Sequence, residues 1–463
     1  MQHYLIKNIS VVNENTIAIA DVLIRNGRID KIAKSIQTNL AVIEINGEGK
    51  YLLPGAIDDQ VHFREPGLTH KATIYSEAKA AVAGGVTSFM EMPNTIPNAL
   101  TVELLEDKYE IASKSALANF SFFMGTANNN ADEVLKVNRL KDKICGIKIF
   151  MGSSTGNMLV DNYVTLDKLF RESELLIATH CEEEKIIKAN YDRLKLEKPA
   201  LTASDHPIIR NEEACFESSL AAIQFAKKYN SRLHILHIST AKELQLFSNL
   251  MPLKEKRITA EVCVHHLHFT SNDYEQLGYL IKCNPAIKAP HNREALWEAL
   301  LDDRLDVIAT DHAPHTLEEK GYSRDENGKL RERKNIQYEN AHAGLPLVQH
   351  PLLLMLHYYK QGRIGLEKIV EKMSHAVADC FQVKSRGYIR EGYWADLVIV
   401  DMNQSNLVTP QNILYQCGWS PMEGFSFPAS ITHTFVNGHL VYENYGNAVW
   451  NESHKGMRLA FER

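Results

Sequence analysis

Eight short apolar segments, separated mostly by amphipathic, helix-like stretches, constrain the fold of this chain more than any other feature. Alternating strand-like and helix-like units predict parallel strands joined by helical crossovers. Eight such strands favour a TIM-type (β/α)8 barrel over an open doubly wound sheet, which would also need a glycine-rich phosphate turn after its first strand. The expected strands are Ala56–Phe63, Ser88–Pro93, Phe120–Gly125, Ile147–Gly152, Leu175–His180, Leu233–Ser239, Thr259–His265 and Val307–His312.

The two ends of the chain resemble each other and differ from the middle. Val22–Ile29 and Thr434–Val441 each place an Asn-Gly pair between apolar alternations, which is a strong hairpin signal because both turn residues tolerate positive φ. Ala395–Val400 is a further buried-strand candidate. We expect the ends to join into one small β-sandwich domain, with two unrelated terminal hairpins as the alternative. The predicted bounds are 1–52 with 385–463 for the β domain and 53–384 for the barrel.

Composition excludes several classes of protein. The 463 residues are 44% hydrophobic and 23% charged, and the net charge of −6 gives no reason to expect nucleic acid or an anionic membrane as a partner. The seven cysteines are odd in number and form no C-x-x-C pair, so we expect free thiols in a reducing compartment. The sequence shows neither a signal peptide nor an apolar run of about 18 residues. We therefore expect a cytoplasmic protein.

Polar side chains lie at or just past the ends of five predicted strands. They are His62, Lys148, His180, His237 and Asp311. The carboxyl ends of barrel strands form one face, where catalytic residues gather. One histidine after a strand is usually a hydrogen-bonded core residue. Three histidines and an aspartate converging on one face favour a metal site.

Four motifs together resemble those of the dihydroorotases and, more broadly, the cyclic amidohydrolases. They are Asp58–Gly67, Met92–Thr95, His237–Thr240 and Ala309–His315. The motifs occur in the family's order, and the flanking β segments also resemble the family's composite domain, so the likeness covers nearly the whole chain. Any one motif alone is weak, but the set is highly specific. A dihydroorotase interconverts N-carbamoyl-L-aspartate and L-dihydroorotate in pyrimidine biosynthesis.

The resemblance implies a zinc centre and a role for each polar residue. Lys148 would be carboxylated and would bridge two metals, since burial favours the neutral amine that reacts with carbon dioxide; a lysine that reaches the barrel mouth or pairs with an acid is the alternative. His180 and His237 would complete the inner metal site, and His62 and Asp311 would hold the outer metal. Asp311 would also be the general acid and base.

One position departs from the family pattern. The first strand usually carries an H-x-H pair, and here the first histidine is Gln60. A neutral amide oxygen is a weaker zinc ligand than imidazole. We therefore expect one firmly bound Zn²⁺ and a weakened second site. The change also raises the hypothesis of an inactive dihydroorotase-like subunit that supports a partner such as aspartate carbamoyltransferase, although the other five ligands are retained.

The substrate prediction depends on a carboxylate that dihydroorotate carries and neutral cyclic amides lack. Arg64 follows His62 by two residues, on the same strand face, and arginine binds carboxylates bidentately. A structural ion pair with Glu65 is the alternative. By analogy with the family, we expect further substrate contacts from Asn94, Asn284, His315 and Gly344. Allantoinases and dihydropyrimidinases share the barrel and its ligands, so they remain alternative functions. A homodimer is common among such enzymes.

Three further predictions concern the surroundings of the site. The charged segment Thr316–Asn340 follows the last strand and is interpreted as a mobile lid, with a solvated surface insertion as the alternative. His265 and His266 also end a strand, and we expect them to support the site by hydrogen bonds rather than to bind metal. Cys181 and Cys263 are expected to be small core residues.

Overall fold

The computed structural model describes residues 2–152, 158–333 and 336–463, and it confirms the predicted barrel. Eight parallel strands are hydrogen-bonded in sequence order from the first to the last. Val61 pairs with His312, and the backbone N–H of His62 donates to the His312 carbonyl at 2.7 Å, which closes the ring between the last and first strands. The strands are β6 (Ala56–Val61), β7 (Val86–Glu91), β8 (Asn119–Gly125), β9 (Gly146–Phe150), β10 (Ile177–His180), β11 (Leu233–Ile235), β12 (Ile258–Cys263) and β13 (Val307–Ala309).

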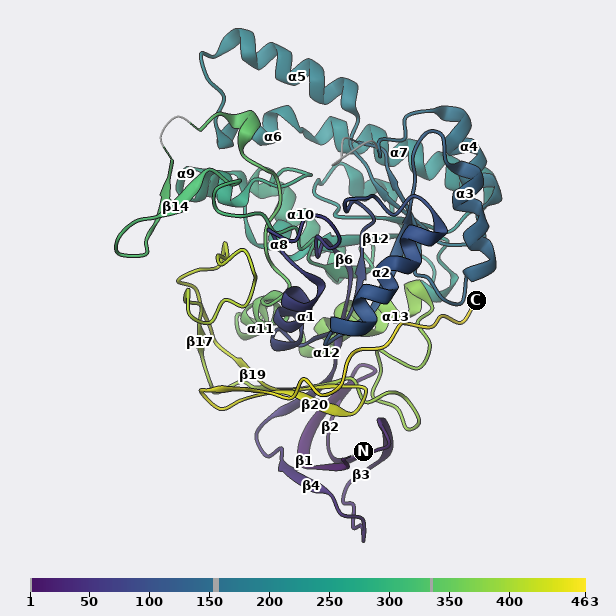
Figure 1. Ribbon diagram of the computed structural model, residues 1–463, viewed down its shortest axis with the longest axis vertical. Helices are drawn as coiled ribbons and strands as arrows, with labels where there is room; N and C mark the ends of the chain where they lie inside the picture. The colour runs from purple at the N-terminus through teal and green to yellow at the C-terminus, as the bar shows by residue number, and fades with distance from the viewer. Residues whose placement is uncertain (1, 153–157, 334–335) are drawn as a thin grey trace.

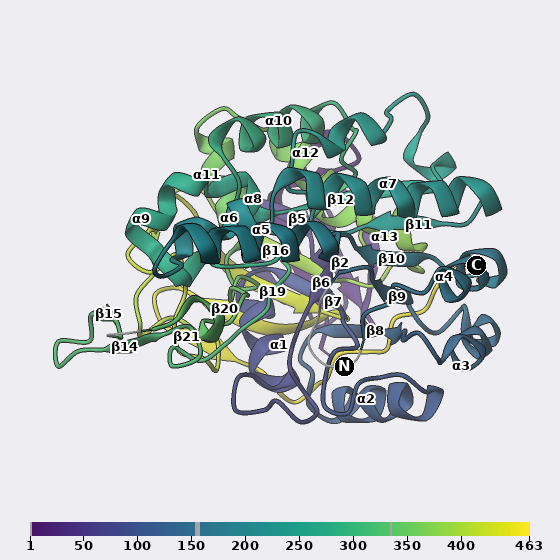
Figure 2. The ribbon, with the colours of Figure 1, turned by 90° about the horizontal axis from the view of Figure 1, so that it is seen from above.

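Helices surround this barrel, as the view from above shows (Figure 2). Their apolar faces cover the strands: α4, for example, buries Leu166, Leu169 and Phe170, which share one helix face. The Asn162 side chain caps its first turn. The helices are α1 (Ile74–Ala83), α2 (Val102–Ser115), α3 (Ala131–Leu135), α4 (Tyr163–Glu172), α5 (Glu184–Glu197), α6 (His206–Ile209), α7 (Glu212–Tyr229), α8 (Val264–His268), α9 (Tyr274–Leu277), α10 (Pro290–Leu301), α11 (Pro351–Lys360), α12 (Leu366–Val370) and α13 (Ala376–Phe381).

The two ends of the chain form one sheet beside the barrel, as predicted (Figure 1). The sheet order is β21-β20-β19-β16-β5-β1-β2-β3, with β4 also paired to β1. β5 joins the N-terminal strand β1 to the C-terminal strand β16. The strands are β1 (Tyr4–Asn13), β2 (Thr16–Arg25), β3 (Arg28–Ala33), β4 (Ile43–Asn46), β5 (Tyr51–Pro54), β16 (Leu397–Asp401), β19 (Ser430–Val436), β20 (His439–Asn444) and β21 (Ala448–Trp450); β17 (Asn406–Leu407) and β18 (Ser426–Phe427) pair separately.

Both predicted hairpins are present in that sheet. Asn26 and Gly27 turn β2 into β3, and Asn437 and Gly438 turn β19 into β20, all four with positive φ. These turns are therefore determined locally, by residues that accept left-handed backbone. The domain bounds drawn at 52 and 385 remain a prediction, and β5 runs across the first of them.

The predicted lid contains a short hairpin, β14 (Tyr322–Arg324) with β15 (Leu330–Glu332), which extends away from the barrel (Figures 1 and 2). Its base is anchored by Lys320, a fully buried side chain that donates to the carbonyls of Lys282, His342 and Gly344. Residues 334 and 335 of this segment lie outside the described residues. Whether the hairpin moves stays a prediction.

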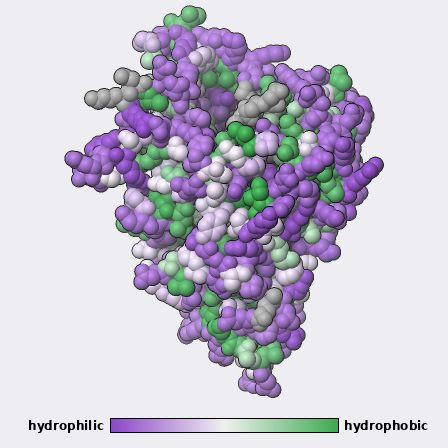
Figure 3. All heavy atoms as spheres, viewed as in Figure 1, coloured by the Kyte–Doolittle hydropathy of each residue, from purple (hydrophilic) through white to green (hydrophobic). Residues whose placement is uncertain are grey.

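The face of the molecule in Figure 3 is mostly hydrophilic, with hydrophobic residues scattered across it. Among the described helices, none combines the length and apolar character needed to cross a membrane.

Candidate active site

A cavity of about 310 Å³ contains nearly all of the predicted site residues. These side chains lie on barrel strands and on the loops that follow them, and they come together because parallel strands end on the same face of the barrel. Nine of the predicted residues line the cavity, and Lys148 is fully buried outside the lining. The lining residues are Gln60, His62, Arg64, Asn94, Phe150, His180, Arg210, His237, Asn284, Asp311, Ala313, His315, His342, Ala343 and Gly344.

Four of the expected metal ligands form two close pairs. Nε2 of His62 lies 3.1 Å from Oδ1 of Asp311, and Nδ1 of His180 lies 2.9 Å from Nε2 of His237. Nδ1 of His62 lies 2.7 Å from the Asn94 amide oxygen, so a proton on Nδ1 leaves Nε2 with its lone pair. Burial lowers the pKa of both His62 and His237, which keeps these imidazoles neutral. Neutral imidazoles and a carboxylate are ligands that zinc prefers.

Lys148 provides the buried amine that the sequence predicted. Its Nζ has no hydrogen-bond partner among the described residues and lies 4.5 Å from the centroid of the Phe150 ring. Burial lowers its pKa to about 7, although the charges of Asp311 and Glu261 oppose the shift. A neutral amine without a partner is the form that a carboxylation reaction requires.

Three of the lining residues have left-handed backbone. The φ angles are 68° at Arg64, 41° at His237 and 47° at Asp311. Such conformations are costly for residues other than glycine and cluster at functional sites. At His237 the backbone N–H donates to Oε1 of the buried Glu261 at 2.9 Å, which stabilises the turn that aims this imidazole at His180.

The substrate-side residues form a second, cationic part of the cavity. Arg64 is 4% exposed; its Nε donates to the Pro314 carbonyl at 3.1 Å, and its Nη2 lies 3.1 Å from Nε2 of His315. Burial lowers the pKa of Arg64 to about 10, so the guanidinium remains charged at neutral pH. No carboxylate of the described residues lies within salt-bridge distance of Arg64, and Glu65 instead accepts from the Ile74 backbone. The structure therefore does not contain the alternative, an ion pair between Arg64 and Glu65.

Gln60 is the residue at which the sequence departs from the expected H-x-H pair. Its Nε2 donates to Oδ1 of Asp311 at 3.1 Å, and its Oε1 lies 3.8 Å from Sγ of Cys263. The amide thus offers its nitrogen, which cannot bind a metal, to the shared carboxylate. A weakened second metal site stays a prediction.

Two lining or supporting residues were missed by the sequence analysis. Arg210 lines the cavity and forms an ion pair with Glu182, whose Oε2 also lies 3.1 Å from Nε2 of His180. Glu182 follows His180 by two residues, so its position could have suggested a supporting carboxylate. Arg210 follows α6, far from any strand end, and no motif marks it.

Asn284 is contacted from α6, and Lys282 links the segment before Asn284 to the segment before Gly344. Nε2 of His206 lies 3.1 Å from Oδ1 of Asn284, and Nζ of Lys282 donates to the carbonyls of Tyr338 and Ala341. At Gly344, φ is 145° and an added Cβ would lie 2.4 Å from the Ala313 carbonyl oxygen. Only glycine fits this position without a shift of the backbone.

The donors in this cavity fit a metal centre. Three imidazoles, a carboxylate and a buried amine meet at one end of the barrel, and the Lys148 amine has no hydrogen-bond partner among the described residues. Buried polar groups are normally satisfied, so an amine without a partner indicates a missing ligand.

Comparisons with known proteins agree with this geometry. The model of the amidohydrolase family matches residues 210–441, and a dihydro-orotase-like model matches residues 49–186. A dihydroorotase from Methanosarcina acetivorans is 30% identical over 453 residues, covering 94% of this chain and 91% of the relative. A dihydroorotase from Pyrococcus abyssi is 31% identical, covering 88% and 89%. An allantoinase from Desulfitobacterium hafniense is 28% identical, covering 96% of each.

Solved structures show the same fold. The L-hydantoinase (dihydropyrimidinase) from Arthrobacter aurescens superposes with a TM-score of 0.86 at 24% identity, covering 97% of this chain and 98% of that one. A D-hydantoinase from a Thermus species gives 0.85 at 23%, covering 98% of each. Barrel, terminal sheet and polar cavity thus define a hydrolase of the metal-dependent barrel class. The chain belongs to the amidohydrolase family, in its dihydroorotase-like group, and it is an enzyme that hydrolyses cyclic amides.

Proposed function

We propose that this enzyme interconverts N-carbamoyl-L-aspartate and L-dihydroorotate, the cyclisation step of de novo pyrimidine biosynthesis. The observation that carries the proposal is Arg64: a buried, charged guanidinium that opens into the cavity without a carboxylate partner among the described residues. A buried charge without a partner is costly unless a ligand satisfies it. The free carboxylate of dihydroorotate is such a ligand.

The metal would be held by residues already close together. His180 and His237 with a carboxylated Lys148 would hold one zinc ion, and His62 with Asp311 would form a second, weaker site. When bound, zinc supplies Lewis acidity that polarises a carbonyl and activates water near neutral pH.

Asp311 is the residue proposed to move the proton. Its Oδ1 accepts from Gln60 and lies 3.1 Å from His62, so the carboxylate is fixed in orientation within the cavity. In the hydrolytic direction Asp311 takes a proton from the attacking water and delivers it to the leaving ring nitrogen. In the direction of synthesis it takes the proton from the carbamoyl nitrogen as the C–N bond forms, and it gives that proton to the hydroxide that leaves the carboxyl carbon as water.

The remaining residues bind and orient the substrate. Arg64 and His315, 3.1 Å apart, form a polar corner for the ring carboxylate, with Asn94 nearby in the lining. Asn284 and the backbone at Gly344 would contact the ring amide from the opposite loops. We also expect the enzyme to work in the cytoplasm as a homodimer.

The competing hypothesis is that the substrate is a neutral cyclic amide, because the chain is also similar to an allantoinase. The deciding experiment measures hydrolysis of dihydroorotate, allantoin and dihydrouracil by the purified protein supplied with zinc and bicarbonate. The Asp311→Asn variant, which has nearly the same shape, is the control for turnover by contaminants. Turnover of dihydroorotate alone supports the proposal, and turnover of a neutral ring overturns it. Absence of turnover together with little bound zinc supports an inactive subunit instead.

A further inference from the structure

We propose that Cys263, His265 and His266 form a separate binding site for a thiophilic metal ion such as Zn²⁺, with the Gln60 amide oxygen as a fourth donor. The site lies beside the cavity described above and uses none of the His180, His237 or Lys148 donors. Its existence does not depend on which cyclic amide the enzyme hydrolyses.

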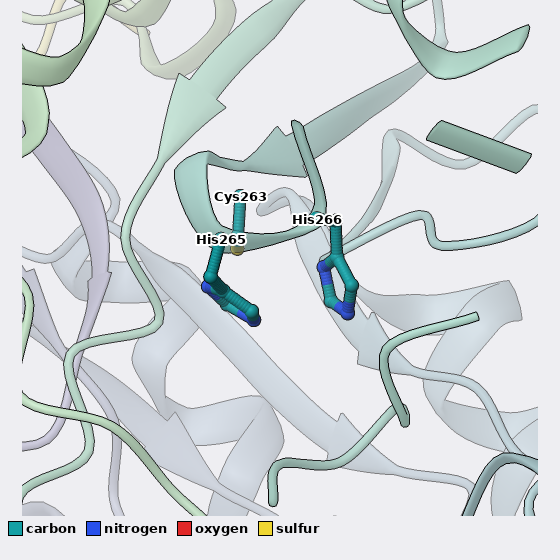
Figure 4. Close-up of side chains that lie close together, drawn as sticks. All are labelled: Cys263, His265 and His266. Atoms are coloured by element: carbon teal, nitrogen blue, oxygen red, sulfur yellow. The ribbon is translucent and has the colours of Figure 1, made fainter. Parts of the chain in front are cut away.

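The three side chains come from one tight turn. Cys263 is the last residue of β12, and His265 and His266 lie in α8, which follows directly. Figure 4 shows the cysteine and both imidazoles grouped around this turn. All three residues are buried, and one donor atom from each lies within 4.8 Å of the other two. Cysteine and histidine are the ligands of protein zinc sites.

Both imidazoles have nitrogen atoms without a hydrogen-bond partner among the described residues. Nε2 of His266 donates to the Pro285 carbonyl at 3.1 Å, which puts the proton there and leaves Nδ1 as a free lone pair without a partner among the described residues. The Thr310 carbonyl lies near the His265 ring, yet neither nitrogen of that ring makes a hydrogen bond of acceptable geometry within the described part of the chain. The sequence analysis expected supporting hydrogen bonds from both residues, and only His266 makes one.

The Cys263 thiol is buried beside a carboxyl group. Sγ of Cys263 lies 3.6 Å from Oε1 of Glu261, and burial with the nearby acids raises the pKa of the thiol well above its usual value. A thiol is thus protonated in the absence of metal, and coordination would deprotonate it. Of the nearby acids, Asp311 is the carboxylate that also accepts from Gln60, so it lies close to the proposed ion.

The donor atoms of the three side chains lie within 4.8 Å of one another, so they would have to move closer together to hold an ion. Zinc bonds of about 2.0–2.3 Å place tetrahedral ligands roughly 3.5 Å apart. The amide of Gln60 already presents its oxygen to Cys263 at 3.8 Å, because its nitrogen is engaged by Asp311. The residue that weakens the family's second metal site therefore supplies a donor to this one.

Two other groups of potential ligands do not support a similar proposal. In the first, Asp59 and Glu261 lie 3.2 and 3.4 Å from Nε2 of His234, so the charges compensate one another without an ion. In the second, Glu319 is paired with Lys71 and His70. Among these three groups of the described residues, the Cys263 group alone combines a soft ligand with imidazole nitrogens that lack partners.

The test replaces the metal with Co²⁺, which gives a sulfur-to-cobalt charge-transfer absorption band only when a thiolate is bound. We expect this band in the wild-type protein, its loss in Cys263→Ser, and the loss of one equivalent of bound metal. The matched control is Cys181→Ser, because Cys181 is buried and adjacent to His180. The band should persist in that control and in a His180→Ala/His237→Ala double variant.

A wild-type spectrum without a thiolate band overturns the proposal, and so does a band that Cys181→Ser removes. If Cys263→Ser fails to fold, His266→Gln tests the same site, and X-ray absorption of the wild-type zinc protein shows directly whether a sulfur neighbour lies at about 2.3 Å. None of these experiments measures catalytic turnover, so their results would not change if the proposed substrate, dihydroorotate, were wrong.

Discussion

The side-chain amide of Gln60 donates a 3.1 Å hydrogen bond to Oδ1 of Asp311, the carboxylate that the proposed mechanism uses to move a proton. His62 lies 3.1 Å from the same oxygen. In this chain an amide N–H therefore helps to orient Asp311 where the family usually places a second imidazole. The carboxylate keeps its position even if the outer metal site is weak.

Replacing Gln60 by histidine should restore the missing ligand. We expect Gln60→His to bind one more equivalent of zinc per chain than the wild-type protein, because imidazole is the stronger zinc ligand. Elemental analysis after removal and readdition of zinc measures this. Gln60→Asn, whose amide is too short to reach Asp311 in the same way, should gain no metal. Equal metal content in Gln60→His and wild type would contradict the interpretation of this position.

The fold was predictable because its signals are local and repeated. Eight apolar strands and two Asn-Gly turns at residues 26 and 437 appear in the sequence at the places where the structure has them. The strand-end positions of His62 and Asp311 likewise placed them on one face. Such inferences use only spacing along the chain and the common direction of barrel strands.

The rest of the site depends on contacts between distant segments. Arg210 reaches the cavity from the end of α6, and its partner Glu182 follows β10 and lies 28 residues earlier in the sequence. Lys320 is charged and lies in a charged segment, so composition suggested a solvated surface, yet it is fully buried by three carbonyl acceptors. The orientation of the Gln60 amide is likewise a property of its neighbours and not of its residue type.

Removal of the Arg64 guanidinium should weaken binding of an anionic substrate. We expect Arg64→Met to lower kcat/KM for dihydroorotate by about 10²–10³-fold, since losing a buried charge pair costs about 2–5 kcal/mol. Arg64→Lys keeps the charge but loses the hydrogen bonds to Pro314 and His315, so its loss should be smaller. Steady-state kinetics of the three proteins measures the series. Unchanged kcat/KM in Arg64→Met would remove Arg64 from carboxylate binding.

The buried amine of Lys148 predicts a specific pH dependence of stability for the metal-free, bicarbonate-free protein. Its pKa is about 7 in the folded state, against about 10.4 in an unfolded chain. Between these values the unfolded state binds more protons, so the free energy of unfolding should rise with pH by up to about 1.4 kcal/mol per unit. Below pH 7 the cost of burying the amine is fully present, and it disappears above pH 10.

Lys148→Met has no titrating group at this position and should lack that rise. The measurement is urea unfolding of both proteins at pH 7, 8 and 9, and the difference between them isolates Lys148 from other groups that titrate in the same range. If the free energy of unfolding changed with pH in the same way for wild type and Lys148→Met, the amine would not be buried in its neutral form. With bicarbonate and zinc restored, intact-mass analysis of the wild type should show the added mass of one carbon dioxide, which Lys148→Met should lack.

Substitutions of Glu182 and Arg210 should have non-additive effects on the free energy of unfolding, because the two side chains form an ion pair that is shielded from solvent. Burial alone would raise the pKa of Glu182, but the Arg210 charge and His180 lower it to about 2. The ionised carboxylate therefore contributes stability that is fully present above its unfolded pKa of about 4.3 and is lost as pH falls through about 2. Glu182→Gln should cost about 3–5 kcal/mol at neutral pH, since it leaves Arg210 buried without its partner.

A double-mutant cycle separates this coupling from a loss of packing. We expect the Glu182→Gln/Arg210→Met double variant to be more stable at neutral pH than Glu182→Gln alone, because it no longer buries an uncompensated guanidinium. Glu182→Gln should also lose the additional destabilisation that wild type shows between pH 4 and pH 2. Chemical denaturation of the four proteins at these pH values provides the free energies. Additive effects of the two substitutions would mean that the ion pair is not a unit, and that Glu182 acts on His180 independently of Arg210.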